Sequence, residues 1–252
     1  MQQSKFDKGL NRRMSSSRSG PRVALRRVLM FCAALLVAVY PASRLGLFEW
    51  PRAYDPLAVP DLNEAPGLFI SWQMKLVDFE PQNCAAALKL VGHFTAFLPA
   101  KGLGTNCEVT DAIATTIFSS ARIKSEDMRC AIAARLYAWD RHVLQSAARK
   151  HLGTGVKEIL HFGSYNCRPM RGSNRMSEHA TANAFDISGF KLVDGREISL
   201  KRDWHGAADK QRFLRSVRDG LCDWFNVTLS PDYNADHADH FHVDMGLWRS
   251  CR

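Results

Sequence analysis

The sequence predicts an α+β fold in which helices pack on a small, mainly antiparallel sheet. Three helices are expected in the first half of the chain, at 82–98, 112–120 and 125–152. The second half carries strand-like alternation of apolar and polar residues, interrupted by one helix at 209–226. A chain in which the helices come first and the strands follow is typical of this class. In proteins with a parallel sheet, by contrast, strands and helices alternate along the chain.

Apolar spacing and cap residues define the helices. In 82–98 the apolar residues recur one helical turn apart, and the segment ends before Pro99. The helix 125–152 begins at Ser125, a candidate N-cap followed by two acidic residues where the helix dipole favours negative charge. The inward face expected for 209–226 comprises Phe213, Leu214, Val217, Leu221 and Phe225.

Apolar and polar residues alternate with the two-residue period of a strand in three segments, 157–165, 183–190 and 240–246. The last of these places His240, His242 and Asp244 on one face and apolar side chains on the other. In the middle segment, Asp186 lies between small residues on its face, which leaves room for a hydrated ion. One side of the sheet is therefore expected to be core and the other to carry polar chemistry.

Charge and hydropathy define the domain organisation. Residues 1–27 hold eight Lys or Arg and one acid, lack apolar periodicity and are expected to form a disordered basic cytoplasmic tail. The apolar segment 28–48 predicts a signal peptide or, in our preferred interpretation, an uncleaved signal anchor in the inner membrane. Residues 49–80, punctuated by four prolines, are expected to be a linker, which leaves 81–252 as the folded domain.

The positive charge of the chain lies mostly in that tail. The formal net charge is +9, yet the residues after position 27 hold 26 basic and 24 acidic side chains. Phosphate backbones reward a dense basic surface. We therefore expect no nucleic-acid partner, and a secreted metallonuclease is disfavoured.

Cysteine usage agrees with export of the domain. Six of the seven cysteines follow the apolar segment, and an even number in an oxidising compartment predicts up to three disulfides with 15 possible pairings. The chain has no Cys-x-x-Cys pair, so a metal site built from cysteines is not expected. The six residues are Cys84, Cys107, Cys130, Cys167, Cys222 and Cys251.

Two imidazoles and a carboxylate form a candidate metal site. His179 and Asp186 are separated by a short segment that can turn tightly, and His242 from a neighbouring strand completes the set. Zinc in hydrolases is held by three such ligands with water in the fourth position, and that water ionises near neutral pH. A lone His-x-His is common on surfaces, but the joint pattern favours zinc.

Hydrolysis also requires a base that takes the proton of the water and passes it to the leaving nitrogen. His240 and Asp239 are the candidates because both adjoin the expected ligand His242. His237 is near enough to orient one of them or to contact substrate.

Several motifs carry a family resemblance. Ser177-x-His179-x-x-Ala182-x-Ala184-x-Asp186, followed by Asp239-His240-Phe241-His242, resembles the zinc peptidases of the D-alanyl-D-alanine carboxypeptidase and murein endopeptidase group. More closely still, Gly163-Ser-Tyr-Asn-Cys-Arg168, Leu229-Ser-Pro-Asp-Tyr-Asn-Ala and the final Cys251-Arg252 resemble bacterial extensin-like proteins. That name implies no structural role in plant walls. The resemblance covers roughly residues 50–252.

The resemblance implies that His179, Asp186 and His242 are zinc ligands and that His240 or Asp239 is the base. Where carboxypeptidases of the group carry Glu, this chain has Asp239, which is one methylene shorter. The shorter reach favours His240.

Arg168 could bind a substrate carboxylate or stabilise an oxyanion, although a surface ion pair is an equal alternative. Ser177 could hydrogen-bond near the metal or simply cap the turn. The resemblance implies a periplasmic zinc metallopeptidase that hydrolyses amide bonds in peptidoglycan stem peptides or cross-links. The alternative is a wall-binding or scaffolding module that keeps zinc for structure, since a fold alone does not determine chemistry.

Overall fold

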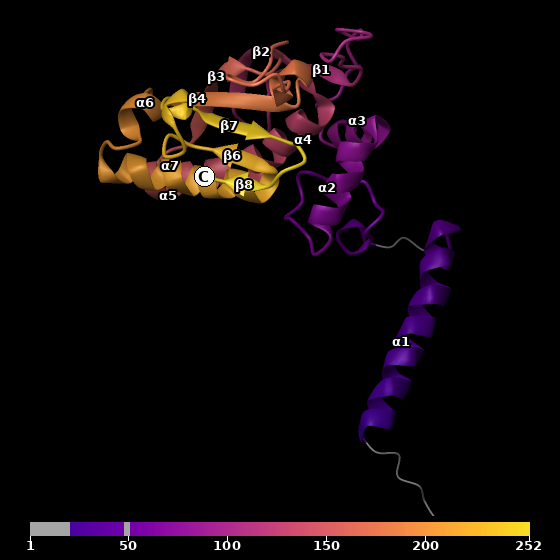
Figure 1. Cartoon of the computed structure of the whole chain (residues 1–252). Coiled ribbons are helices and arrows are strands. Elements are labelled where there is room, and N and C mark those ends of the chain that lie inside the picture. The colour runs from indigo at the N-terminus through magenta and orange to yellow at the C-terminus, as the bar shows by residue number, and fades with distance from the viewer. Residues whose placement is uncertain (1–20, 48–50) are drawn as a thin grey trace, which may run out of the picture. The chain divides into compact units, whose positions relative to one another are not determined.

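The computed structural model describes residues 21–47 and 51–252. The chain divides into two compact units, residues 1–50 and residues 51–252 (Figure 1). Within the described residues the first unit contains helix α1 (Pro21–Arg44), of which Leu25–Ala42 is long and apolar enough to cross a membrane. A signal sequence and a membrane anchor share these properties.

Part of the segment predicted to be a disordered tail is helical. Residues 21–27 form the first turns of α1 because Ala, Leu and Arg, which are good helix formers, make up most of them. The remainder of the tail, residues 1–20, lies outside the described residues, as do residues 48–50, where the predicted anchor ends and the predicted linker begins.

The second unit is built from short helices and one sheet. Its elements are η1 (Arg52–Tyr54), α2 (Ile70–Phe79), α3 (Pro81–Leu90), β1 (Ala112–Ile117), β2 (Arg122–Arg129), α4 (Cys130–Trp139), the π turn η2 (Asp140–Leu144), α5 (Gln145–Leu152), β3 (Val156–Gly163), η3 (Glu178–Thr181), β4 (Ala184–Leu192), β5 (Glu197–Ser199), α6 (Leu200–Asp203), α7 (Ala208–Trp224), β6 (Val227–Leu229), η4 (Ala235–His237), β7 (Phe241–Asp244) and β8 (Ser250–Cys251).

The sheet confirms the α+β class and is larger than the small sheet that was predicted. Its strands follow the order β1-β2-β3-β4-β7-β6-β8, and β5 pairs with β4 outside this path. The sheet is mixed, because β2 and β3 run parallel, as do β6 and β8, while the other pairs are antiparallel. The predicted strands correspond to β3, β4 and β7, and the helix predicted before the last strand is α7.

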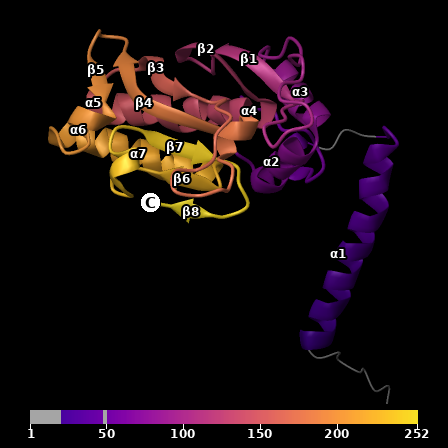
Figure 2. The ribbon, with the colours of Figure 1, turned by 45° about the horizontal axis from the view of Figure 1, so that its top comes forward.

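Helices α4, α5 and α7 lie along one face of the sheet (Figures 1 and 2). Phe185 of β4 and Phe241 and Val243 of β7 are fully buried in the core between these layers. Because side chains alternate along a strand, Asp186 and His242 project from the opposite face. The packing of the core thus determines where the polar residues of both strands lie.

The helix predicted at 112–120 is wrong. Ala112–Ile117 is the strand β1, which pairs antiparallel with β2. The β1 segment holds Ile113, Thr115, Thr116 and Ile117, whose branched side chains favour an extended backbone.

The helix predicted at 125–152 begins five residues later than expected, at Cys130. Ser125 belongs to β2 and is not an N-cap, because the pairing of β2 with β1 keeps this segment extended. From Cys130 the chain stays helical through α4, the π turn and α5. Gly153 then adopts φ 74°, a left-handed conformation that ends helices.

Two further predictions in the N-terminal part require correction. The helix predicted at 82–98 ends at Leu90, and Gly92 with φ 74° turns the chain away. The predicted linker 49–80 contains α2, whose residues Met74 and Val77 are buried in the main core. The prolines that suggested a linker all precede this helix.

Three disulfides join the six cysteines of the second unit. The pairs are Cys84–Cys130, Cys107–Cys167 and Cys222–Cys251. Cys32, in α1, is free and exposed. Together with the apolar helix, the disulfides indicate a secreted or membrane-anchored protein.

Peptide mapping of the oxidised protein without reductant tests this connectivity. We expect the three cross-linked pairs of peptides that the structure predicts, with Cys32 alone accessible to an alkylating reagent. A different set of cross-linked peptides would contradict the arrangement of α3, α4 and the loop that contains Cys167.

A buried ion pair joins α2 to the domain. Arg135 of α4 donates hydrogen bonds from Nε and Nη2 to the carboxylate of Asp78 at 3.0 and 2.5 Å. Its Nη1 donates to the carbonyl oxygen of Trp224 at 2.5 Å, so the guanidinium links α2, α4 and α7. Burial raises the pKa of Asp78, and the bonds from Arg135 oppose that rise.

Arg135→Ala should lower the free energy of unfolding by about 3–5 kcal/mol, because it leaves the carboxylate of Asp78 without its partner. Chemical denaturation measures this loss. Arg202→Ala is the matched control, since the pair of Arg202 with Glu197 is solvent-exposed, and its loss should cost less than about 1 kcal/mol. Equal effects of the two substitutions would contradict the role of the buried pair.

Candidate metal centre

The three predicted ligands converge on the open face of the sheet. Asp186 of β4 lies directly opposite His242 of β7 in their antiparallel pairing. His179 belongs to η3, the short helical turn that leads into β4. One donor atom from each side chain lies within 4.8 Å of the other two, so the group could hold a metal ion.

The separations between these atoms suit a small tetrahedral cation. Oδ1 of Asp186 lies 2.9 Å from Nδ1 of His242 and 3.2 Å from Nε2 of His179. The two ring nitrogens are 3.2 Å apart. Zinc binds nitrogen and oxygen at about 2.0–2.2 Å, so the edges of its tetrahedron are about 3.3 Å long.

The partners of the two rings determine which nitrogens carry hydrogen. Nδ1 of His179 lies 2.7 Å from the carbonyl oxygen of Ser164, which only accepts, so Nε2 of the neutral ring presents a lone pair. Nε2 of His242 lies 2.9 Å from Oδ2 of Asp244, so Nδ1 presents a lone pair as well. The lone pairs of these two ring nitrogens both point toward Oδ1 of Asp186. Three acceptors at these distances require a positive charge between them.

In the absence of a metal, a proton on His242 satisfies this requirement. Burial disfavours the charged ring, but hydrogen bonds to Asp186 and Asp244 outweigh burial and raise the pKa of His242 to about 9. Burial also disfavours the charged form of Asp186, yet hydrogen bonds with His179 and His242 hold its pKa well below its ordinary range. The cluster therefore attracts either a proton or a metal cation.

A short turn places His179. The hydroxyl oxygen of Ser177 accepts a hydrogen bond from the backbone N–H of His179 at 3.3 Å and caps η3. Ala182 then adopts φ 52°, which redirects the chain into β4. This conformation costs a non-glycine residue roughly 1–2 kcal/mol. The amide of Asn183 donates to Glu178 at 2.7 Å and closes the turn.

His240 lies beside the cluster with one nitrogen facing it. Its Nε2 is 3.7 Å from Oδ1 of Asp186. Its Nδ1 is 3.0 Å from Oδ1 of Asp239 and donates to that carboxylate. Asp239, the other candidate base, therefore orients the ring of His240.

His237 also reaches this region. The centroid of its ring lies 5.2 Å from that of His240 and 5.8 Å from that of His242. Nδ1 of His237 is 2.6 Å from Oδ1 of Asn234. Burial, and then the nearby rings of His242 and His240, lower the pKa of His237 to about 4, so the ring is uncharged at neutral pH.

The remaining predicted residue lies apart from these contacts. Arg168 is exposed in the segment between β3 and η3, and among the described residues its guanidinium makes no hydrogen bond or ion pair. The ion pair considered for it is therefore absent from the described part of the chain. Its backbone oxygen accepts from the N–H of Ser177 at 3.2 Å, which links the segment to the cap of η3.

Two groups that hold the ligands were not assigned from the sequence. The carbonyl oxygen of Ser164 orients His179, and no residue type signals a backbone acceptor. Asp244 orients His242 and could have been assigned from its position two residues further along the same face. Such outer partners set the tautomer and orientation of a metal-binding imidazole.

The fold and the cluster define the class of protein. It is an α+β domain with a candidate metal centre on the face of the sheet opposite α4, α5 and α7. The family model described as "Extensin-like protein C-terminus" matches residues 82–252, and the chain belongs to that family. No curated protein and no solved structure matches the chain.

Binding of zinc to the metal-free protein should depend on pH. His242 is protonated below about pH 9 and must lose this proton to become a ligand. The apparent association constant should therefore rise about tenfold per pH unit between about pH 6 and 8, with release of one proton. Titration calorimetry with zinc in two buffers of different ionisation enthalpy measures both quantities.

Asp244→Asn is the matched variant for this experiment. It removes one of the two carboxylates that raise the pKa of His242, so the pH dependence should become shallower. A wild-type affinity that does not change with pH, or one without proton release, would contradict the assignment of His242 as a ligand.

Proposed function

We propose that this protein is a zinc-dependent hydrolase of amide bonds in peptidoglycan stem peptides or cross-links, acting in the periplasm. The observation that supports the proposal is that one donor atom each from His179, Asp186 and His242 converge on one point. The distances between these atoms suit the ligands of a tetrahedral cation. Two imidazoles and one carboxylate are also the donor set of several catalytic zinc sites.

When bound there, zinc supplies a Lewis acid that polarises a substrate carbonyl and lowers the pKa of a water molecule. The chain supplies the remaining functions. Ser164 and Asp244 hold the two rings in the tautomers that leave their lone pairs directed at the cluster. His179 is almost fully buried, whereas Asp186 and His242 are partly accessible, so substrate could approach from the side of these two strands.

His240 has the geometry of a general base. Asp239 accepts a hydrogen bond from the N–H at Nδ1, which leaves the lone pair of Nε2 facing the cluster. From this position His240 takes one proton from the attacking water. It then gives that proton to the nitrogen of the leaving amine, which departs as the amide bond breaks. Asp239 stabilises the charged ring between the two transfers.

The surface around the cluster provides contacts for a large substrate. Phe162 is 61% exposed, and its ring meets His240 edge-on at 5.6 Å between centroids. Tyr233 is 45% exposed and meets His237 in the same way at 5.4 Å. We assign Arg168 to a carboxylate of the substrate because its guanidinium is exposed and has no partner within the described residues.

The choice of peptidoglycan depends on two arguments. The motifs at 177–186 and 239–242 resemble those of zinc peptidases that act on cell-wall peptides. The disulfides and the apolar helix indicate a protein whose folded domain leaves the cytoplasm. Outside the cytoplasm this domain would meet the cell wall.

His240→Ala should reduce hydrolysis of purified sacculi by about 10²–10⁴-fold, because it removes the proton carrier. Its zinc content should equal that of the wild type, since the three ligands remain. The assay uses the full chain with zinc or with a chelator, and mass spectrometry of the released peptides identifies the bond that is cut. His205→Ala is the control because His205 is an exposed histidine in the segment between α6 and α7.

Hydrolysis that survives the chelator, or a His240→Ala variant as active as the wild type, would contradict the proposed mechanism. A protein that binds zinc and loses stability in His242→Ala, but never releases a peptide, would instead be a scaffold that uses zinc for structure.

A further inference from the structure

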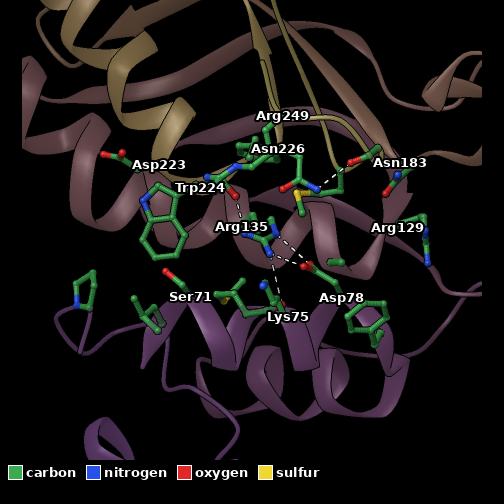
Figure 3. A pocket seen from close by; sticks show the side chains of 18 of the residues that line it. Ser71, Lys75, Asp78, Arg129, Arg135, Asn183, Asp223, Trp224, Asn226 and Arg249 are labelled. Carbon is green, nitrogen blue, oxygen red and sulfur yellow. Dashed lines mark hydrogen bonds and ion pairs between the residues drawn. The ribbon is translucent and has the colours of Figure 1, made fainter. Parts of the chain in front are cut away.

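A second site lies away from the cluster. A cleft of about 1230 Å³ lies between α2 on one side and residues of α4, α7 and the C-terminal segment on the other (Figure 3). Its opposite wall includes Arg135 of α4, Trp224 of α7 and Met245 after β7, so it opens on the helix-packed side of the sheet. None of the three predicted metal ligands lines it.

The α2 wall of the cleft lies N-terminal to the residues that the family model matches. Ser71, Met74, Lys75, Asp78 and Phe79 all precede residue 82, where the match to the family begins. The buried pair between Asp78 and Arg135 holds this wall in place. The segment expected to be a linker therefore builds one side of a cleft.

The lining carries an excess of positive charge, contributed by Lys75, Arg129, Arg135 and Arg249 against Asp78 and Asp223. Arg135 is fully engaged by its partners, and Arg129 pairs with Asp111. Lys75 and Arg249 are exposed, and within the described residues neither makes a hydrogen bond or an ion pair. These two cations lie on opposite walls and are available to a ligand (Figure 3).

Apolar side chains accompany these charges. Phe79 is 84% exposed and Leu247 is 91% exposed, although both line the cleft. Large apolar groups left in water at the edge of a cleft are typical of a binding surface. The ligand should therefore combine anionic groups with apolar parts.

We propose that this cleft binds a peptide that carries separated carboxylates and an amino group. The carboxylates pair with Lys75 and Arg249, the amino group lies near Asp223, and aliphatic side chains contact Phe79 and Leu247. A phosphate group would instead need several donors that converge on one point. Here Lys75 and Arg249 lie on opposite walls of the cleft, with the ion pair of Arg135 and Asp78 between them (Figure 3).

Peptides of this chemistry occur in peptidoglycan, and this identification of the ligand rests on the proposed function. The cleft would then hold one part of the wall polymer while the metal cluster acts on another. Two contacts with one polymer raise the retention of the protein, because the second contact forms at a high effective concentration.

The test is calorimetric titration of the full chain, in detergent and with chelator present, with soluble peptides released from sacculi. Lys75→Gln/Arg249→Gln should weaken binding at least tenfold. Lys157→Gln/Lys201→Gln is the matched control, because it removes two exposed positive charges that lie outside the cleft, and it should bind within twofold of the wild type. Thermal unfolding of both variants confirms that they fold.

Equal binding by the two double variants, or the absence of peptide binding by the wild type, would overturn the proposal. Displacement of the peptide by millimolar inorganic phosphate, with phosphate binding lost in the cleft variant, would assign the cleft to phosphate and overturn it as well. Peptide binding that depends on Lys75 and Arg249 in a protein that never hydrolyses sacculi would support the cleft and refute the proposed function alone.

Discussion

The register of β4 against β7 is the constraint on which the candidate site depends. Asp186 lies opposite His242, while their neighbours Phe185 and Val243 are buried beneath the helices. Because side chains alternate, a shift of one residue in either strand would bury a charged group and expose an aromatic or branched one. Burial of the apolar face and assembly of the cluster are therefore consequences of the same pairing. η3 then needs only a short turn to add His179.

The contacts around the cluster give it a strong preference for positive charge. Ser164 and Asp244 hold the two imidazoles so that their ring-nitrogen lone pairs point at the carboxylate of Asp186. These lone pairs and the carboxylate repel one another. Such an arrangement stores unfavourable electrostatic energy unless a proton or a metal ion occupies the centre. His240, oriented by Asp239, lies beside the cluster with Nε2 facing Asp186. The proposed metal-assisted hydrolysis depends on these two features, a centre for a cation and a neighbouring group that can carry a proton.

The N-terminal part of the second unit, before the residues that the family model matches, packs into the same compact unit. α2 packs through Met74 and Val77, and the ion pair of Asp78 with Arg135 joins it to α4. The disulfide Cys84–Cys130 connects α3 to the same helix. These contacts place a wall of mixed charge opposite the C-terminal strands, on the side of the sheet that the cluster does not use.

The sequence by itself determined the features that follow from local periodicity and residue chemistry. It identified the strands that carry Asp186 and His242, the helix α7, the six cysteines that form disulfides and the three side chains that converge. The tertiary structure alone decided the features that depend on non-local pairing. Ser125 has a good cap pattern, yet it is extended because β2 pairs with β1, and α2 is ordered because its apolar face is buried. Cysteine partners, the carbonyl oxygen that orients His179 and the cleft beside α2 likewise arise only when distant segments pack together. Local propensities are worth less than about 1 kcal/mol per residue, so the burial and pairing of whole elements override them.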